Sequence, residues 1–149
     1  PYRGHDTRDY YEVRAEAKLG LGDVQGAIND VNASIEIDFP RGSWSFTVAA
    51  LIKCAAEDYS GALEEVKLGI KTFASGDDDN EWLGNFLFIR GIVKFKMGNT
   101  EDGCIDLQRV KTLVSKRAWS YNLDISSSIY SGFVGNMRNE IESCVLEIE

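Results

Sequence analysis

The sequence predicts an all-α protein built from antiparallel helix pairs. Apolar residues recur at three- and four-residue steps through most of the 149-residue chain, which is the period of a helix with one buried face. Short turns interrupt these helical stretches at Gly22-Asp23, Glu57-Asp58 and Gly98-Asn99. The length is that of a single domain large enough to bury a core.

The first predicted pair consists of residues 8–19 and 24–37. Asp6 or Thr7 is expected to cap the first helix. Gly22 can adopt the left-handed conformation that ends a helix, and Asp23 can cap the next one. One face of the second helix is apolar and carries Ala27, Ile28, Val31 and Ile35.

Two further pairs and a last helix follow. Pro40 breaks the chain, and Ser43 is expected to cap residues 44–56, which pair with residues 59–73. Residues 81–97 and 100–114 form the third pair. Apolar side chains occupy nearly the whole circumference of residues 81–97, so that helix must be covered on more than one side. Residues 129–148 show a strong amphipathic pattern that predicts a final helix.

The three pairs are repeats of one unit. A small residue in each first helix is followed twelve positions later by another small residue. Two antiparallel helices need such residues where their backbones approach most closely. Successive units are 35 and 41 residues apart, and the longer step falls in the Asp-rich segment 75–80. The paired small residues are Ala15 and Ala27, Ala50 and Ala62, and Gly91 and Gly103.

Over residues 8–114 the chain resembles the tetratricopeptide repeat family, best in the stretches 22–38 and 57–70. Lys18, Lys53 and Lys94 replace the aromatic residue usual for the family. The resemblance implies a right-handed α-α superhelix. It gives one domain over residues 1–149, with repeats at about 8–40, 43–75 and 80–114 and a capping segment at 115–149.

The resemblance also implies that the first helices line a concave groove. The implied groove is acidic at one end and apolar at the other. Exposing its large apolar side chains would forgo about 1.5–3 kcal/mol each, so something must cover them. We prefer the final helix as the cover, and the alternative is a docked peptide, a docked helix or a second copy of the chain. The groove positions are Asp9, Glu12, Glu16, Trp44, Thr47, Leu51, Cys54, Asn85, Phe88, Ile92 and Phe95.

These features predict a non-catalytic protein–protein interaction scaffold that binds a peptide or helix in its concave groove. The alternatives are a helical regulatory domain of a larger enzyme and a small-ligand-binding helical bundle. No catalytic residue is expected, because the single histidine, His5, stands near one end of the chain and no nucleophile has a defined partner. No cofactor is expected either.

Charge and cysteine content limit the partners. The net charge of −8 and the pI of about 4.7 argue against nucleic acid and against anionic membrane surfaces. No apolar run is long enough to span a bilayer. The cysteines Cys54, Cys104 and Cys144 are odd in number and lie in apolar helical patterns, so we expect buried reduced thiols. These features favour a soluble protein of the cytoplasm.

Two apparent ligand motifs are better explained by structure. Glycines at Gly20, Gly22 and Gly26 match a dinucleotide-binding spacing, but a helix and not a strand precedes them. Asp77, Asp79 and Glu81 alternate as in a calcium loop, but Trp82 and Phe88 stand where that loop needs glycine and glutamate. No metal site is expected.

Overall fold

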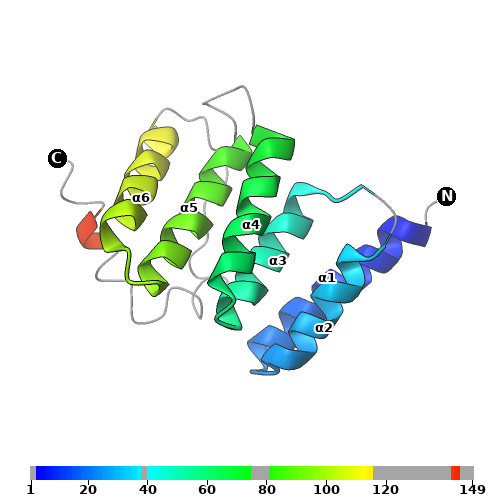
Figure 1. Cartoon of the computed structure of the whole chain (residues 1–149). Coiled ribbons are helices and arrows are strands. Elements are labelled where there is room, and N and C mark those ends of the chain that lie inside the picture. Colours follow the sequence, from blue (N-terminus) through cyan, green and yellow to red (C-terminus); the bar gives the residue numbers. More distant parts are fainter. Residues whose placement is uncertain (1–2, 38–39, 75–80, 116–141, 145–149) are drawn as a thin grey trace.

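Every described helix lies beside its neighbour in the chain, and together they form three hairpins (Figure 1). The computed structural model describes residues 3–37, 40–74, 81–115 and 142–144. These residues contain no strand. The predicted all-helical architecture of packed adjacent helix pairs is therefore confirmed. The hairpins are α1 (Arg3–Gly20) with α2 (Val24–Ile35), α3 (Ser43–Ala55) with α4 (Tyr59–Gly69), and α5 (Glu81–Lys96) with α6 (Thr100–Ser115).

The three hairpin turns have one conformation. The first residue of each turn has positive φ: +83° at Gly22, +64° at Glu57 and +83° at Gly98. In the first two turns the following aspartate caps the next helix, because the Oδ1 atoms of Asp23 and Asp58 each accept a hydrogen bond from a backbone N–H at 2.9 Å. The predicted turns and the predicted Asp23 cap are confirmed.

The predicted small residues lie where the paired helices touch. Ala15, Ala27, Ala50 and Ala62 are all 0% exposed. In the third hairpin the helices approach too closely for a side chain, since a Cβ atom added to Gly103 would lie 2.9 Å from the carbonyl oxygen of Gly91. A side chain at that position would push α5 and α6 apart.

An ion group with a buried aspartate and partly exposed cations crosses the helix pair in the first and third hairpins. Arg14 binds Asp30 through two hydrogen bonds of 2.8 and 2.6 Å, and Lys18 approaches the same carboxylate at 2.9 Å. In the third hairpin the corresponding residues are Arg90, Asp106 and Lys94, with distances of 2.8, 2.7 and 2.8 Å. The repeated lysines thus pair with an acid on the second helix.

The middle hairpin builds the same group from different residues. Ala49 occupies the arginine position, and Glu65 replaces the aspartate. Arg41, just before α3, supplies the missing guanidinium and binds Glu65 at 2.8 Å, while Lys53 binds the other oxygen at 2.6 Å. The longer glutamate side chain suits an arginine that approaches from outside the helix pair.

Some predicted helix ends differ from the observed ones. α1 begins at Arg3, so Asp6 and Thr7 lie inside the helix and do not cap it. Gly42 occupies the capping position of α3 without a side-chain hydrogen bond, and Ser43 is the first helical residue. α4 continues as a π-helical turn, η1 (Ile70–Ala74). The predicted loop 75–80 and nearly all of the predicted cap at 115–149 lie outside the described residues.

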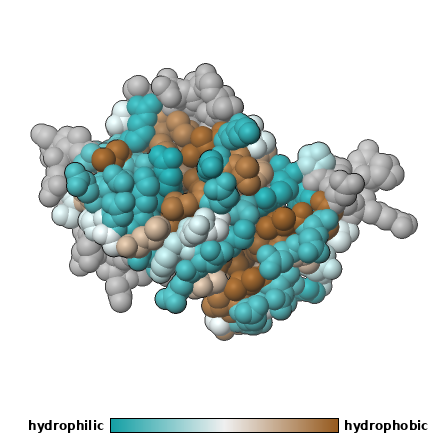
Figure 2. All heavy atoms as spheres, in the orientation of Figure 1, coloured by the Kyte–Doolittle hydropathy of each residue, from teal (hydrophilic) through white to brown (hydrophobic). Residues whose placement is uncertain are grey.

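The larger core cluster belongs to the second and third hairpins and includes Phe86, Ile89 and Leu107. A smaller cluster joins the first hairpin to α3 through Val31, Val48 and Ile52, among others. On the face visible in Figure 2, hydrophilic residues cover much of the α5–α6 hairpin, and an apolar band follows the α1–α2 hairpin. Among the described helices, none is both long and apolar enough to cross a membrane.

The cysteine prediction is wrong for two of the three residues. Cys104 of α6 and Cys144 form a disulfide across 40 residues of sequence, with their Cα atoms 5.3 Å apart. Residues this far apart in sequence carry no spacing signal, and the burial of Cys144 against α6, where Gln108 donates to its carbonyl oxygen, brings them together. Cys54 is a free thiol, and burial raises its pKa to about 12.

Candidate functional site

A cavity of about 400 Å³ lies between the first part of α1 and the start of α3. Arg8, Glu12 and Val13 line it from α1. Trp44 and Ser45 line it from α3, and the loop before α3 completes it. Adjacent hairpins meet here, so the cavity occupies a joint between repeats and not the packed interior of one repeat.

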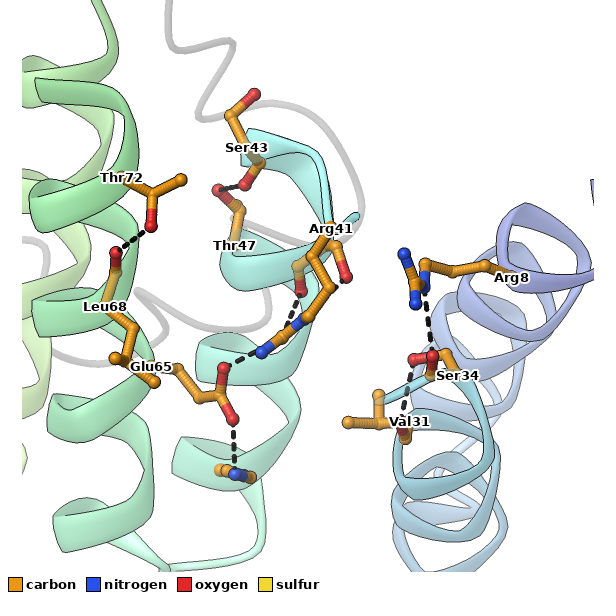
Figure 3. Close-up of polar contacts among 11 residues, drawn as sticks. Arg8, Val31, Ser34, Arg41, Ser43, Thr47, Glu65, Leu68 and Thr72 are labelled. Carbon is orange, nitrogen blue, oxygen red and sulfur yellow. Dashed lines mark hydrogen bonds and ion pairs between the residues drawn. The ribbon is translucent and has the colours of Figure 1, made fainter. Parts of the chain in front are cut away.

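Arg8 crosses from α1 to the end of α2 at one side of the cavity. Its Nε atom donates to the Ser34 carbonyl oxygen at 3.0 Å, and its Nη2 atom donates to the Ile37 carbonyl oxygen. Figure 3 shows this side chain reaching Ser34. The third nitrogen, Nη1, is buried and has no hydrogen-bond partner among the described residues. One strong donor of the cavity wall is therefore unused.

Glu12 and Glu16 stand one helical turn apart on the face of α1 that meets α3. Each has a buried Oε1 atom that accepts no hydrogen bond from any described residue. Glu12 is only 3% exposed, and burial raises its pKa against the opposing effect of a hydrogen bond from Ser45. Burial likewise raises the pKa of Glu16 to about 7, partly offset by a hydrogen bond from Trp44. Both carboxyl groups lack a full set of partners.

Apolar side chains form an accessible rim around these polar groups. Trp44 is 45% exposed and Val13 is 63% exposed. Arg41 lies over the ring of Phe46, and Figure 3 shows it extending to Glu65. Its charge is thus already paired, so the free polar atoms of the cavity belong to α1.

The other predicted groove residues lie elsewhere. Thr47 is buried and donates a hydrogen bond to the Ser43 carbonyl oxygen (Figure 3). Asn85, on α5, is half-buried and outside the cavity. The remaining groove positions belong to the larger core cluster and are at most 7% exposed, so the need for a partner to cover them does not arise. These core residues are Leu51, Cys54, Phe88, Ile92 and Phe95.

The resemblance placed Asp9, Glu12, Glu16 and Trp44 in one groove. The structure brings Asp9, Glu12 and Trp44 to one cavity, and Trp44 also donates a hydrogen bond to Glu16. The sequence-based prediction did not include Arg8. The signal was available, because Arg8 precedes Glu12 by four residues on the same helix face.

The described residues bring together no three His, Cys, Asp or Glu side chains that could hold a metal ion. The predicted Asp-rich alternation lies almost entirely outside the described ranges. A scan of the chain against known protein-family models finds no match, and no curated protein matches it in sequence.

Proposed function

We propose that this chain is a non-catalytic module that binds a segment of another polypeptide in the cavity between α1 and α3. One observation carries the proposal. Arg8 and Glu12 are each 3% exposed and line a cavity with polar atoms that no described residue satisfies. Buried polar groups are nearly always hydrogen-bonded, so such atoms beside an open cavity favour a ligand.

The rim of the cavity favours a polypeptide ligand. The exposed ring of Trp44 and the exposed side chain of Val13 offer apolar contact beside the polar atoms. Protein-binding surfaces combine aromatic anchors with a few directed polar groups in this way. Enzyme chemistry has less support, because the described lining residues include no cysteine, and no histidine that could activate Ser43 or Ser45.

We propose the tetratricopeptide-like superhelix as the scaffold for this site, with residues 115–149 as its cap. The recurrence of one turn, one small-residue contact and one ion group in successive hairpins supports a repeat array. In such an array the first helices share the inner face, and both α1 and α3 are first helices. The cavity would then be the first joint of the groove.

Selection from a random-peptide display library tests the binding function. Peptides enriched on the wild-type chain should lose at least about tenfold in affinity for the Trp44→Ala variant, as expected for an aromatic anchor. Ile105→Ala is the matched control, because Ile105 is 57% exposed on α6, far along the chain from the cavity. It should bind as the wild type does. Equal binding to all three proteins would contradict the proposal.

A further inference from the structure

We infer that the cavity between α1 and α3 receives a basic side chain, lysine or arginine, of the partner polypeptide. The side chain would lie beside the carboxylate of Glu12 and the Trp44 ring, which line the cavity, and would extend toward Glu16, which is hydrogen-bonded to Trp44. A main-chain carbonyl of the same segment would accept a hydrogen bond from Nη1 of Arg8. The inference rests on the proposed binding function and specifies its ligand.

The unpartnered atoms define what the ligand must supply. Two are acceptors, the Oε1 atoms of Glu12 and Glu16, and one is a donor, the Nη1 atom of Arg8. An ammonium group has three donors and a guanidinium has five, so either can serve both carboxylates. The backbone next to a basic residue carries the carbonyl oxygen that Arg8 needs. One short segment of polypeptide thus satisfies all three atoms.

Charge around the site selects a cation. On α1, Glu12 faces Arg8 and Asp9, and from the α3 side it faces Ser45 and Arg41. Both arginines already donate to other acceptors, as described above. Burial raises the pKa of Glu12, which means that these cations do not fully compensate its charge. An acidic ligand would add a further negative charge, whereas a basic one supplies the missing counter-charge.

The geometry of α1 and α3 fits a long basic side chain. Residues four apart on a helix have Cβ atoms about 5–6 Å apart, so one cation can reach both Glu12 and Glu16. The indole of Trp44, hydrogen-bonded to Glu16 and 45% exposed, lies at the same place. A cation over an indole face gains a further attraction from the ring. The net charge of −8 assists the approach of a basic segment.

Degenerate peptide pools test the inference on the full chain. We would use fluorescein-labelled nonapeptides with blocked termini, no other basic residue, and lysine, arginine, norleucine or glutamate at the centre. The lysine and arginine pools should bind the wild type at least about tenfold more tightly than the norleucine pool, and the glutamate pool should bind most weakly. Fluorescence anisotropy gives the affinities.

Matched variants locate the effect. In Glu12→Gln/Glu16→Gln the advantage of lysine over norleucine should fall to about twofold or less. In Glu36→Gln/Glu101→Gln it should remain, because these exposed residues carry the same charge but lie outside the cavity. Glu16→Gln alone, at the less buried position, should reduce the advantage partly. Circular dichroism checks that each variant is folded.

The outcomes separate the two proposals. Equal binding of the lysine and norleucine pools, with both weakened by Trp44→Ala, would overturn the basic ligand but keep the binding function. If no pool binds the wild type better than Trp44→Ala, the binding function itself fails. If free n-butylammonium binds as tightly as the lysine pool, the claim that the ligand is a polypeptide segment is overturned. If the preference for lysine over norleucine is also lost in Glu36→Gln/Glu101→Gln, the preference comes from the net charge of the protein. That result would overturn the assignment of the binding site to Glu12 and Glu16.

Discussion

The hairpins α1–α2 and α5–α6 carry the same ion group, and Asp30 in one corresponds to Asp106 in the other. Their first helices differ at the positions just beside the small contact residue. Glu12 stands three residues before Ala15, and Phe88 stands three residues before Gly91. Glu16 and Ile92 each follow that small residue directly. Equivalent positions are therefore ionisable in the first hairpin and apolar in the third.

This difference shows that equivalent positions of a repeated hairpin can contribute to the core in one copy and remain incompletely hydrogen-bonded in another. In the third hairpin Phe88 is 4% exposed and Ile92 is 0% exposed, and both contribute to the core. In the first hairpin the corresponding carboxylates retain oxygen atoms without hydrogen bonds among the described residues. The ion group joins the two helices in both hairpins, whereas the residues beside the small contact residue differ between them.

Exchanging the side-chain types at these equivalent positions should have the largest effect on the free energy of unfolding. Phe88→Glu would bury a carboxylate without a partner in the core, and we expect it to lower the free energy of unfolding by at least about 4 kcal/mol. Glu12→Leu makes the reverse change. It should cost less than about 1 kcal/mol or stabilise the chain, because it removes an incompletely paired charge. Urea denaturation measures both, and similar losses would contradict the comparison.

The shared ion groups should contribute similarly in both hairpins. Asp30→Asn and Asp106→Asn each leave two cations without a counter-charge, and we expect losses of about 2–4 kcal/mol in the free energy of unfolding. Glu64→Gln is the control. It removes an exposed ion pair with Lys67 and should change stability by less than about 0.5 kcal/mol. A large effect in only one hairpin would show that the two groups are not equivalent.

The pH dependence of the Asp30 group has a defined sign. The hydrogen bonds from Arg14, followed by the contact with Lys18, lower the pKa of Asp30 to about 2. Its contribution to stability is therefore present above the unfolded pKa near 4 and is lost as pH falls toward 2. Comparing the wild type with Asp30→Asn over this range isolates the contribution, and parallel curves would contradict it.

A pH effect of opposite sign should mark Glu16. Its pKa of about 7 in the folded chain lies above the ordinary value, so the protonated form is favoured on folding. Stability should thus be greatest below the unfolded pKa near 4.3 and fall as pH rises through 7. We expect a difference of about 1–2 kcal/mol, and Glu16→Gln should remove it. Thermal denaturation between pH 5 and pH 8 provides the measurement, with Glu101→Gln as the control.

Substitutions in the turns should have the smallest effect on the free energy of unfolding. Glu57 adopts φ +64° where the other two turns have glycine. Glu57→Gly should raise the free energy of unfolding by about 0.5–1 kcal/mol, because glycine has no Cβ atom to clash in this conformation. The reverse change, Gly98→Ala, should lower it by about 1 kcal/mol. Thermal shifts of equal sign for the two variants would show that the turns are not equivalent.

The repeat could be predicted from the sequence because its signals are local. Ala15 and Ala27, for example, stand twelve residues apart across a turn that glycine and aspartate mark clearly. The ion group was missed although its signal was present. Lys18, Lys53 and Lys94 are each followed twelve residues later by an acid, and that spacing joins the same two helices.

The site could be predicted only in part. The resemblance to tetratricopeptide repeats implied that Glu12, Glu16 and Trp44 share a groove with Phe88 and Ile92. It could not show that Phe88 and Ile92 on the same face are covered, because coverage depends on which elements pack there. The Cys104–Cys144 pairing was beyond sequence reasoning for the same reason.

That disulfide also changes the covalent connectivity of the chain. From Cys104 to Cys144 the backbone and the sulfur bridge together form a closed ring. A single peptide-bond cleavage inside the ring would open it without releasing a fragment, so the mass of the protein would change only by the water added. Two pieces would separate after reduction alone. Gel electrophoresis of a cleaved sample with and without reductant would therefore distinguish cuts in this third of the chain from cuts in the first two hairpins.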